Sequence, residues 1–188
     1  MAAISAMAAA MERKVALLRA VNVGGRKLAM AELRLLCGQI GWSDVATYIQ
    51  SGNLLFAAQG EPQALERQLE QAILERFAME VPVIVRTAGQ WAEYPNGNPF
   101  PVAARDEPNR LMLLLSKAPP EPEAEAQLQS RAADGERVKA AGDALWILYP
   151  AGSARSRLTP TLIDRAMGSP ATARNHRTVI KLQEMLRA

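Results

Sequence analysis

Hydrophobic and polar positions along this chain follow two spacings, one typical of strands and one typical of helices. A nearly unbroken apolar run of strand length covers 14–21, and the apolar residues of 30–40 recur at helical spacing. Gly41 fits the position just beyond the end of that helix. The beginning of the pattern therefore predicts a strand, a loop and an amphipathic helix.

The next stretch adds two strands, a helix and a closing strand. Residues 45–50 and 54–57 have strand character, and Ser51–Asn53 between them is typical of a tight hairpin. An apolar stripe along 63–78 predicts a second helix, and 81–86 alternates as a strand. The order is βαββαβ, the ferredoxin-like arrangement.

A similar order follows a short helix predicted near 87–94 and a stretch rich in Pro, Gly and Asn. The predicted elements are a strand at 110–116, a helix at 121–131, strands at 136–140 and 144–149, and helices near 159–167 and 175–187. This second half echoes the first in element order, without evident repetition of residues.

The predicted fold class is α+β, with two ferredoxin-like (βαββαβ-type) subdomains, the second an imperfect repeat ending in C-terminal helices. The expected organisation is a leader at 1–12, a first subdomain at 13–94, a linker at 95–109 and a second subdomain at 110–188. The strands at 15–21 and 144–149 are apolar on both faces, whereas a lone ferredoxin-like sheet leaves one face open. We therefore expect the open faces to be covered by each other or by a second copy of the chain.

Composition narrows the class of protein, since 49% hydrophobic and 22% charged residues are ordinary for a globular chain. One cysteine excludes an internal disulfide framework, and one histidine excludes the usual histidine-rich metal sites. We expect no metal, a reducing cytoplasmic location, and no membrane partner, because no apolar run approaches the roughly 20 residues that span a bilayer. No cofactor can be named.

The first residues, 1–11, lack the basic start and the long apolar core of a secretory signal. We interpret them as a mobile leader. Met1, Met7 and Met11 are alternative starts of translation, since foldable patterning begins only near Arg13.

Charge is unevenly distributed, although the net charge is only +3. Residues 151–188 contain seven Lys or Arg and two Asp or Glu. Such a segment could meet phosphate, nucleic acid or an acidic partner, and a solvated helix face is the simpler interpretation.

Candidate chemistry gathers at one end of the first predicted sheet. The loop that contains Gly24, Gly25, Arg26 and Lys27 can present backbone N–H groups and positive charge to an anion. It lacks the Lys-Ser/Thr pair of a P-loop and the third glycine of a dinucleotide fingerprint, so it assigns no nucleotide.

Topology brings the following hairpin to the same end, because the first two strands of a βαββαβ unit run in the same direction. The predicted rim combines Asn22, Gly24, Gly25 and Lys27 with Gln50, Ser51 and Asn53. The set holds neither a carboxylate nor a histidine, so no catalytic residue is assigned. The same residues would also serve as ordinary turns.

Three segments of the sequence resemble the signature blocks of the DUF1697 family, bacterial proteins of unassigned biochemical function. They are 16–25, 47–53 and 172–182, and the likeness extends from about Arg13 to the C-terminus. The resemblance implies two α+β subdomains and supplies no established substrate. Ala20 stands where the family typically has glycine, which suggests that this strand end needs no special φ. His176 stands where a tryptophan is usual, which puts a role based on indole stacking in doubt.

The third block combines a helix start with cations. Asn175 fits the N-cap position, and Arg174 and Arg177 lie near the positive end of the helix dipole. Such clustering is unfavourable without a nearby negative group, which is either a bound phosphate or carboxylate or an acidic side chain of the other subdomain. Arg174 and Asn175 therefore join the candidate ligand-binding residues.

Several other residues have a structural interpretation. Cys37 lies on the apolar stripe of its helix, and Trp42, Phe56 and Trp146 are expected in the core or between subdomains. Arg19, in an otherwise apolar strand, must reach a carboxylate, a carbonyl or the rim. His176 is interpreted as a partly buried histidine and not as a general base.

Three functions remain open. The first is a binding domain or enzyme for a phosphate- or carboxylate-bearing small molecule at the predicted rim. The second is RNA binding by the basic C-terminal segment and Tyr48, although the strands lack the interleaved aromatic and basic residues of an RRM. The third is a non-catalytic interaction protein, whose covered sheet faces form a homodimer or bind a partner.

Overall fold

The computed structural model describes residues 11–25 and 27–188. Residues 1–10 of the expected leader 1–12 and the loop cation Arg26 lie outside the described residues. The first subdomain contains β1 (Arg13–Leu18), α1 (Met30–Gln39), β2 (Ser43–Tyr48), β3 (Asn53–Ala57), α2 (Pro62–Phe77) and β4 (Val83–Thr87). Two helices follow it, α3 (Ala88–Asn96) and α4 (Pro101–Asp106). The second contains β5 (Leu111–Leu115), α5 (Ala124–Gln129), β6 (Arg137–Ala141), β7 (Ala144–Leu148), α6 (Pro160–Met167), β8 (Thr172–Asn175) and α7 (His176–Arg187).

Both subdomains have the same sheet topology, which confirms the α+β class and the repeated ferredoxin-like arrangement. The strand orders are β2-β3-β1-β4 and β6-β7-β5-β8. All neighbouring strands are antiparallel. In each sheet the first and third strands lie at the centre and are buried, because both of their faces are covered.

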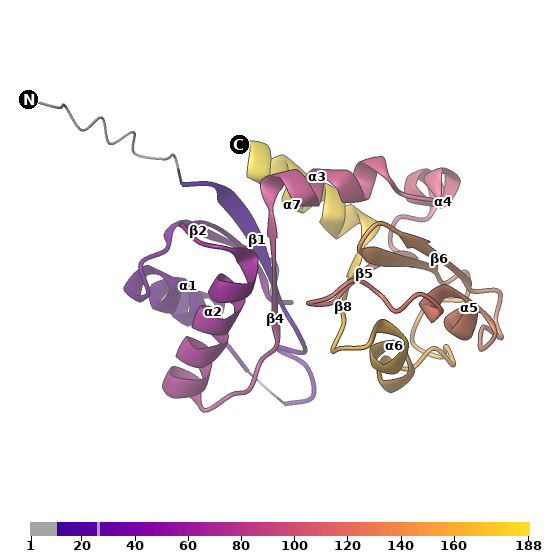
Figure 1. Ribbon diagram of the computed structural model, residues 1–188, viewed down its shortest axis with the longest axis horizontal. Helices are drawn as coiled ribbons and strands as arrows, with labels where there is room; N and C mark the ends of the chain where they lie inside the picture. Colours follow the sequence, from indigo (N-terminus) through magenta and orange to yellow (C-terminus); the bar gives the residue numbers. More distant parts are fainter. Residues whose placement is uncertain (1–10, 26) are drawn as a thin grey trace, which may run out of the picture.

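The sheets face each other across an inner core that includes α3 and α7 (Figure 1). Val15 and Leu17 of β1 point into this core together with Trp146 of β7, and Trp91 of α3 donates a hydrogen bond to the carbonyl of Val179 at 3.2 Å. The open faces are therefore covered within the chain. This fulfils the first of the two expectations for those faces and explains why β1 and β7 are apolar on both sides.

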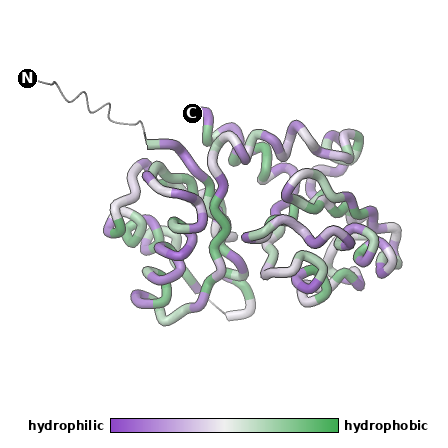
Figure 2. The backbone as a smooth tube through the Cα atoms, in the orientation of Figure 1, coloured by the Kyte–Doolittle hydropathy of each residue, from purple (hydrophilic) through white to green (hydrophobic). Residues whose placement is uncertain are grey.

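The outer face of each sheet carries its own helices. Helices α1 and α2 cover the first sheet, where Trp42 stacks on Phe56 with ring centroids 3.8 Å apart and Cys37 is fully buried. Helices α5 and α6 cover the second sheet. Figure 2 shows the hydrophobic stretches along the central strands and more hydrophilic positions on the outer helices. The core roles expected for the aromatic residues and for Cys37 are confirmed.

Two elements depart from the sequence expectation. The hydrophobic pattern does not predict strand β8, because its four residues, Thr-Ala-Arg-Asn, show no alternation of apolar and polar side chains. These residues form a strand because they pair with β5. The expected linker 95–109 also contains α4 and the last two residues of α3. The second subdomain is thus a full βαββαβ unit, followed by α7 just as the first is followed by α3.

The expectation for Ala20 is wrong. Ala20 has a φ of +53°, so the strand end does need the left-handed conformation that glycine adopts without cost. For a residue with a Cβ atom this conformation costs about 1–2 kcal/mol.

Replacing Ala20 with glycine should therefore raise the free energy of unfolding by about 1 kcal/mol. Urea denaturation measures this change in the free energy of unfolding. The matched control is Ala64→Gly at an exposed position of α2, where the same exchange should lower stability by about 0.5–1 kcal/mol. A destabilised Ala20→Gly variant would show that the conformation carries no strain.

The two β-hairpins offer a second test of backbone constraint. Gly52 (φ +74°) and Gly142 (φ +60°) occupy the two hairpins, but a Cβ at Gly52 would lie 2.7 Å from Leu18 Cβ and 2.6 Å from Val21 Cγ2. A Cβ at Gly142 would meet no atom within 4 Å. Gly52→Ala should lower the free energy of unfolding by about 2–4 kcal/mol, and Gly142→Ala by about 1–2 kcal/mol. Equal losses in urea denaturation would contradict close packing at Gly52.

Candidate functional site

Asn22 ties the β1–α1 loop to the β2–β3 hairpin. Its Nδ2 donates to the carbonyls of Leu28, at 3.0 Å, and Gln50, at 2.7 Å, and its Oδ1 accepts from the Leu28 amide at 2.8 Å. The φ of Asn22 is +57°, a conformation that asparagine tolerates better than most residues. The loop and the hairpin thus lie together at one end of the first sheet, as the topology predicted.

A hollow of about 410 Å³ opens beside this loop. Its lining residues are Asn22, Gly25, Lys27, Leu28, Ala29 and Gln50. Ala29 is the N-cap of α1, and its methyl group cannot accept a hydrogen bond from the first turn. Lys27 and Gln50 are exposed, and Lys27 forms no ion pair with a carboxylate in the described part of the chain.

Ser51, Asn53 and Arg174 form a different group, in which Asn53 and Arg174 are buried and Ser51 is exposed. Arg174 donates from Nε to Asn53 Oδ1, and from Nη2 to the carbonyls of Leu18, Ser51 and Gly52 at 3.0–3.2 Å. Asn53 is fully buried, and its Nδ2 donates to Tyr48 O and Ser51 Oγ, both at 3.0 Å.

The remaining donors of Arg174 are also engaged, because Nη1 reaches Thr172 Oγ1 and the Ala173 carbonyl, both at 2.8 Å. Burial lowers the pKa of this guanidinium to about 10, so it stays charged at neutral pH. Asn175 caps α7 by accepting from the Thr178 amide at 2.9 Å, as expected. Four of the nine candidate ligand-binding residues thus use their side chains in hydrogen bonds within the protein: Ser51, which is exposed, and Asn53, Arg174 and Asn175.

Arg174 also joins the three sequence blocks quoted above. Leu18 belongs to the first block, Ser51–Asn53 to the second and Arg174 to the third. The blocks lie far apart in the sequence and meet at one guanidinium.

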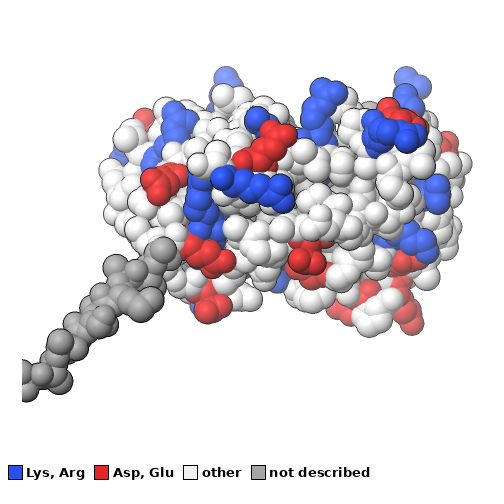
Figure 3. Space-filling model, turned by 90° about the horizontal axis from the view of Figure 1, so that it is seen from above, with Lys and Arg blue, Asp and Glu red and all other residues white. Residues whose placement is uncertain are grey.

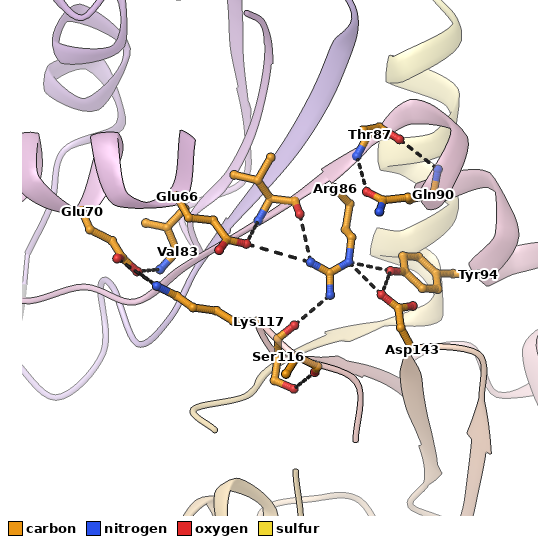
Figure 4. Close-up of polar contacts among 12 residues, drawn as sticks. Glu66, Glu70, Val83, Arg86, Thr87, Gln90, Tyr94, Ser116, Lys117 and Asp143 are labelled. Carbon is orange, nitrogen blue, oxygen red and sulfur yellow. Dashed lines mark hydrogen bonds and ion pairs between the residues drawn. The ribbon is translucent and has the colours of Figure 1, made fainter. Parts of the chain in front are cut away.

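The sequence analysis missed a matching arginine in the first subdomain, shown in Figure 4. Arg86 of β4 donates from Nη2 to the Ser116 carbonyl at 2.7 Å and from Nε to Asp143 Oδ2 at 3.1 Å. Tyr94 accepts from the same Nε at 2.9 Å and donates to Asp143 at 3.1 Å. Glu66 lies 4.0 Å from Nη1, and burial raises the pKa of its carboxyl group.

Arg86 and Arg174 occupy equivalent places. Each lies in the last strand of its sheet, directly before the N-cap of the following helix, Thr87 or Asn175. Each reaches the end of the first strand and the β-hairpin of the other subdomain. The signal available in the sequence was an arginine next to a capping residue at the start of a helix.

The two arginines differ in their counter-charges. Arg86 pairs with Asp143, whereas Arg174 has Asn53 in the matching position and no carboxylate partner among the residues that the structure describes. Asn53 cannot simply be an aspartate, because its Nδ2 is the donor to Tyr48 and Ser51. The second arginine therefore keeps an uncompensated positive charge.

The other candidate groups have structural surroundings. Arg19 reaches the carboxylate of Asp164 at 2.7 Å, as its apolar strand required. His176 is largely buried, its ring centroid lies 5.9 Å from that of Trp146, and burial lowers its pKa. Burial raises the pKa of the Cys37 thiol to about 12, which removes its nucleophilic form at neutral pH.

None of the helices within 11–25 and 27–188 combines the length and apolar character needed to cross a membrane. In the same ranges, no three or more His, Cys, Asp or Glu side chains gather as a possible metal site. The cytoplasmic location remains a prediction.

The sequence of this chain belongs to the family described as "Protein of unknown function (DUF1697)", whose sequence model matches residues 11–146. The resemblance drawn from the three blocks is thereby confirmed, although the third block lies beyond the matched residues. No curated protein matches the chain.

Among solved structures, the conserved bacterial protein SP0830 from Streptococcus pneumoniae is similar. The two chains share 21% sequence identity with a TM-score of 0.74, and the match covers 95% of this chain and 100% of the other. This likeness shows the fold.

Removing the side-chain donors of Arg174 should destabilise the protein strongly. In Arg174→Met the carbonyls of Leu18, Ser51 and Gly52 lose a buried partner, so the free energy of unfolding should fall by about 3 kcal/mol or more in urea denaturation. The control is Arg177→Met, which replaces an exposed arginine in the first turn of α7, with an expected change within about 0.5 kcal/mol. Equal changes in the free energy of unfolding for the two variants would contradict the prediction. They would mean that the cost of desolvating the Arg174 guanidinium is as large as the stabilisation from its hydrogen bonds.

Proposed function

We propose that this protein binds a small phosphate- or carboxylate-bearing molecule at the rim formed by Asn22, Gly24, Gly25, Lys27 and Gln50. The observation that carries the proposal is Lys27, an exposed cation without a carboxylate partner in the described chain, at the hollow beside the start of α1. The described residues that line this hollow include no carboxylate and no histidine, so the proposal is one of binding.

The electrostatics of the helix start support an anion here. The first amides of a helix carry a partial positive charge, and α1 begins at Met30 with an alanine as its N-cap. Glu32 in the first turn offsets part of this field, but it faces Arg76 at 3.8 Å. An anion beside Lys27 would complete the local charge balance.

The glycine pair supports access to the backbone. A Cβ at Gly24 or Gly25 would meet no atom within 4 Å, so packing does not require glycine at either position. Both have positive φ values, +58° and +86°, and their backbone stays open to a close ligand.

The other residues of the predicted set have a supporting role in this proposal. Arg174 holds the end of β1 and the hairpin, and Asn53 holds the turn that carries Gln50. These contacts join the end of β1 to the hairpin, so Ser51, Asn53 and Arg174 position the rim without touching the ligand, whereas Asn175 caps α7.

No comparable observation supports RNA binding or a homodimer. Tyr48, which the RNA hypothesis needed on an open sheet, packs against the inner core. On the face shown in Figure 3, Lys and Arg are scattered among uncharged residues and Asp and Glu, without one continuous patch of positive charge. The homodimer hypothesis needed an open sheet face, and the inner faces are covered within the chain.

Lys27→Ala should weaken binding of inorganic phosphate by about tenfold or more, because it removes a charge-assisted contact. Isothermal titration calorimetry at 0.15 M salt measures the affinity. Lys181→Ala, which removes the same charge at the distant α7, is the matched control and should leave the affinity unchanged. Absence of saturable phosphate and acetate binding to the unmodified protein, or equal losses in both variants, would refute the proposal.

A further inference from the structure

A second cavity lies between the two subdomains, on the other side of the β1–α1 loop. Its volume is about 320 Å³, at the lower end of the range for small-molecule pockets. The first subdomain contributes Val21 and Val23, and the second contributes Leu114 and Ile163. Its walls are therefore largely apolar and come from both halves of the molecule.

One ion pair crosses this cavity. Arg19 of the first subdomain donates from Nη2 to Asp164 Oδ2 of the second at 2.7 Å, and the two side chains are 26% and 27% exposed. Asp164 Oδ1 also accepts from the Ala171 amide at 2.9 Å. Both side chains keep access to solvent, so water can solvate Asp164 when another carboxylate replaces it on Arg19.

The charge of the cavity is not balanced. Arg19 and Asp164 compensate each other, but Arg174 also lines the cavity and has no carboxylate partner within the described ranges. Its five N–H groups are engaged by carbonyl, hydroxyl and amide oxygens, so it supplies a field and not a free hydrogen bond. In the matching place of the other subdomain, Asp143 neutralises Arg86. A monoanion would do the same for Arg174.

The backbone beside Arg19 supports a binding role. Ala20 lines the cavity in the left-handed conformation, which is costly for alanine and sets the direction in which the chain leaves β1. Strain of this kind concentrates at binding sites because the surrounding structure must hold it.

We propose that this cavity binds an apolar monocarboxylate, an acetate with an aryl or branched alkyl substituent. Its carboxylate accepts from the Arg19 guanidinium in place of Asp164, and its apolar body contacts Val21, Leu114 and Ile163. A phosphate dianion fits less well, because with Asp164 it would leave the cavity negative. This site is separate from the rim and does not depend on it.

The probe for the test is phenylacetate, with the neutral phenylacetamide as its isostere. In NMR titrations of methyl-labelled protein, phenylacetate should shift the methyl signals of Val21, Leu114 and Ile163 to saturation. Phenylacetamide should bind at least about tenfold more weakly, because it lacks the charge.

Two variants of the ion pair should change the affinity in opposite directions. Arg19→Gln should weaken phenylacetate binding by about tenfold or more, whereas Asp164→Asn should tighten it, since the competing carboxylate is gone. The carboxamide in Asp164→Asn retains an oxygen for the Ala171 amide, which preserves that local contact. Circular dichroism confirms that both variants are folded.

Several outcomes would overturn the inference. A pair that only joins the subdomains would give losses in both variants or no change in either. Absence of saturable shifts at the cavity methyls would also refute the site, as would equal affinity for phenylacetamide. Lys27→Ala should leave the phenylacetate titration of the Val21, Leu114 and Ile163 methyl signals unchanged, because Lys27 does not line this cavity, so this site and the rim can fail independently.

Discussion

The structure depends on two buried arginine side chains, one from each subdomain, that form hydrogen bonds with the other subdomain. The side chain of Arg86, in the last strand of the first sheet, donates hydrogen bonds to Ser116 and Asp143 of the second subdomain. The side chain of Arg174, in the last strand of the second sheet, donates hydrogen bonds to Leu18 and Asn53 of the first. A guanidinium suits this task because its five donors form a planar fork that can satisfy several oxygens at once. Each subdomain therefore supplies the polar partner that the other needs inside an otherwise apolar junction.

These hydrogen bonds also organise the surface where chemistry is expected. The carbonyls that Arg174 holds belong to the end of β1 and to the β2–β3 hairpin, which flank the rim and the interdomain cavity. A buried guanidinium without a carboxylate is costly unless other dipoles stabilise it, and the backbone carbonyls provide them. Arg174 lines the interdomain cavity, whereas the positive charge at the rim comes from Lys27. Fold alone assigns no function here, and the two proposals rest on these local charges.

Sequence patterns and tertiary contacts contributed to different parts of the candidate site. The direction of the first two strands predicted that the β1–α1 loop and the β2–β3 hairpin lie at the same end of the first sheet. The hydrogen bond from Asn22 to the Gln50 carbonyl confirms this. Local pattern could not reveal that Asn53 is buried, because a Ser-Gly-Asn turn looks the same whether solvent or an arginine faces it. Nor could it reveal the partners of Arg86 in the second subdomain, which lie 30 and 57 positions away.

The sequence by itself determined the order of most elements, the α+β class and the cap of α7, since these depend on periodicity, turn chemistry and capping within a few residues. The tertiary structure alone decided that Thr172–Asn175 is a strand, because this segment is extended only by pairing with β5. It also decided that Arg174 meets Asn53, 121 positions away, and is removed from solvent. Burial and partner choice at such a separation arise only when both subdomains are folded and packed together.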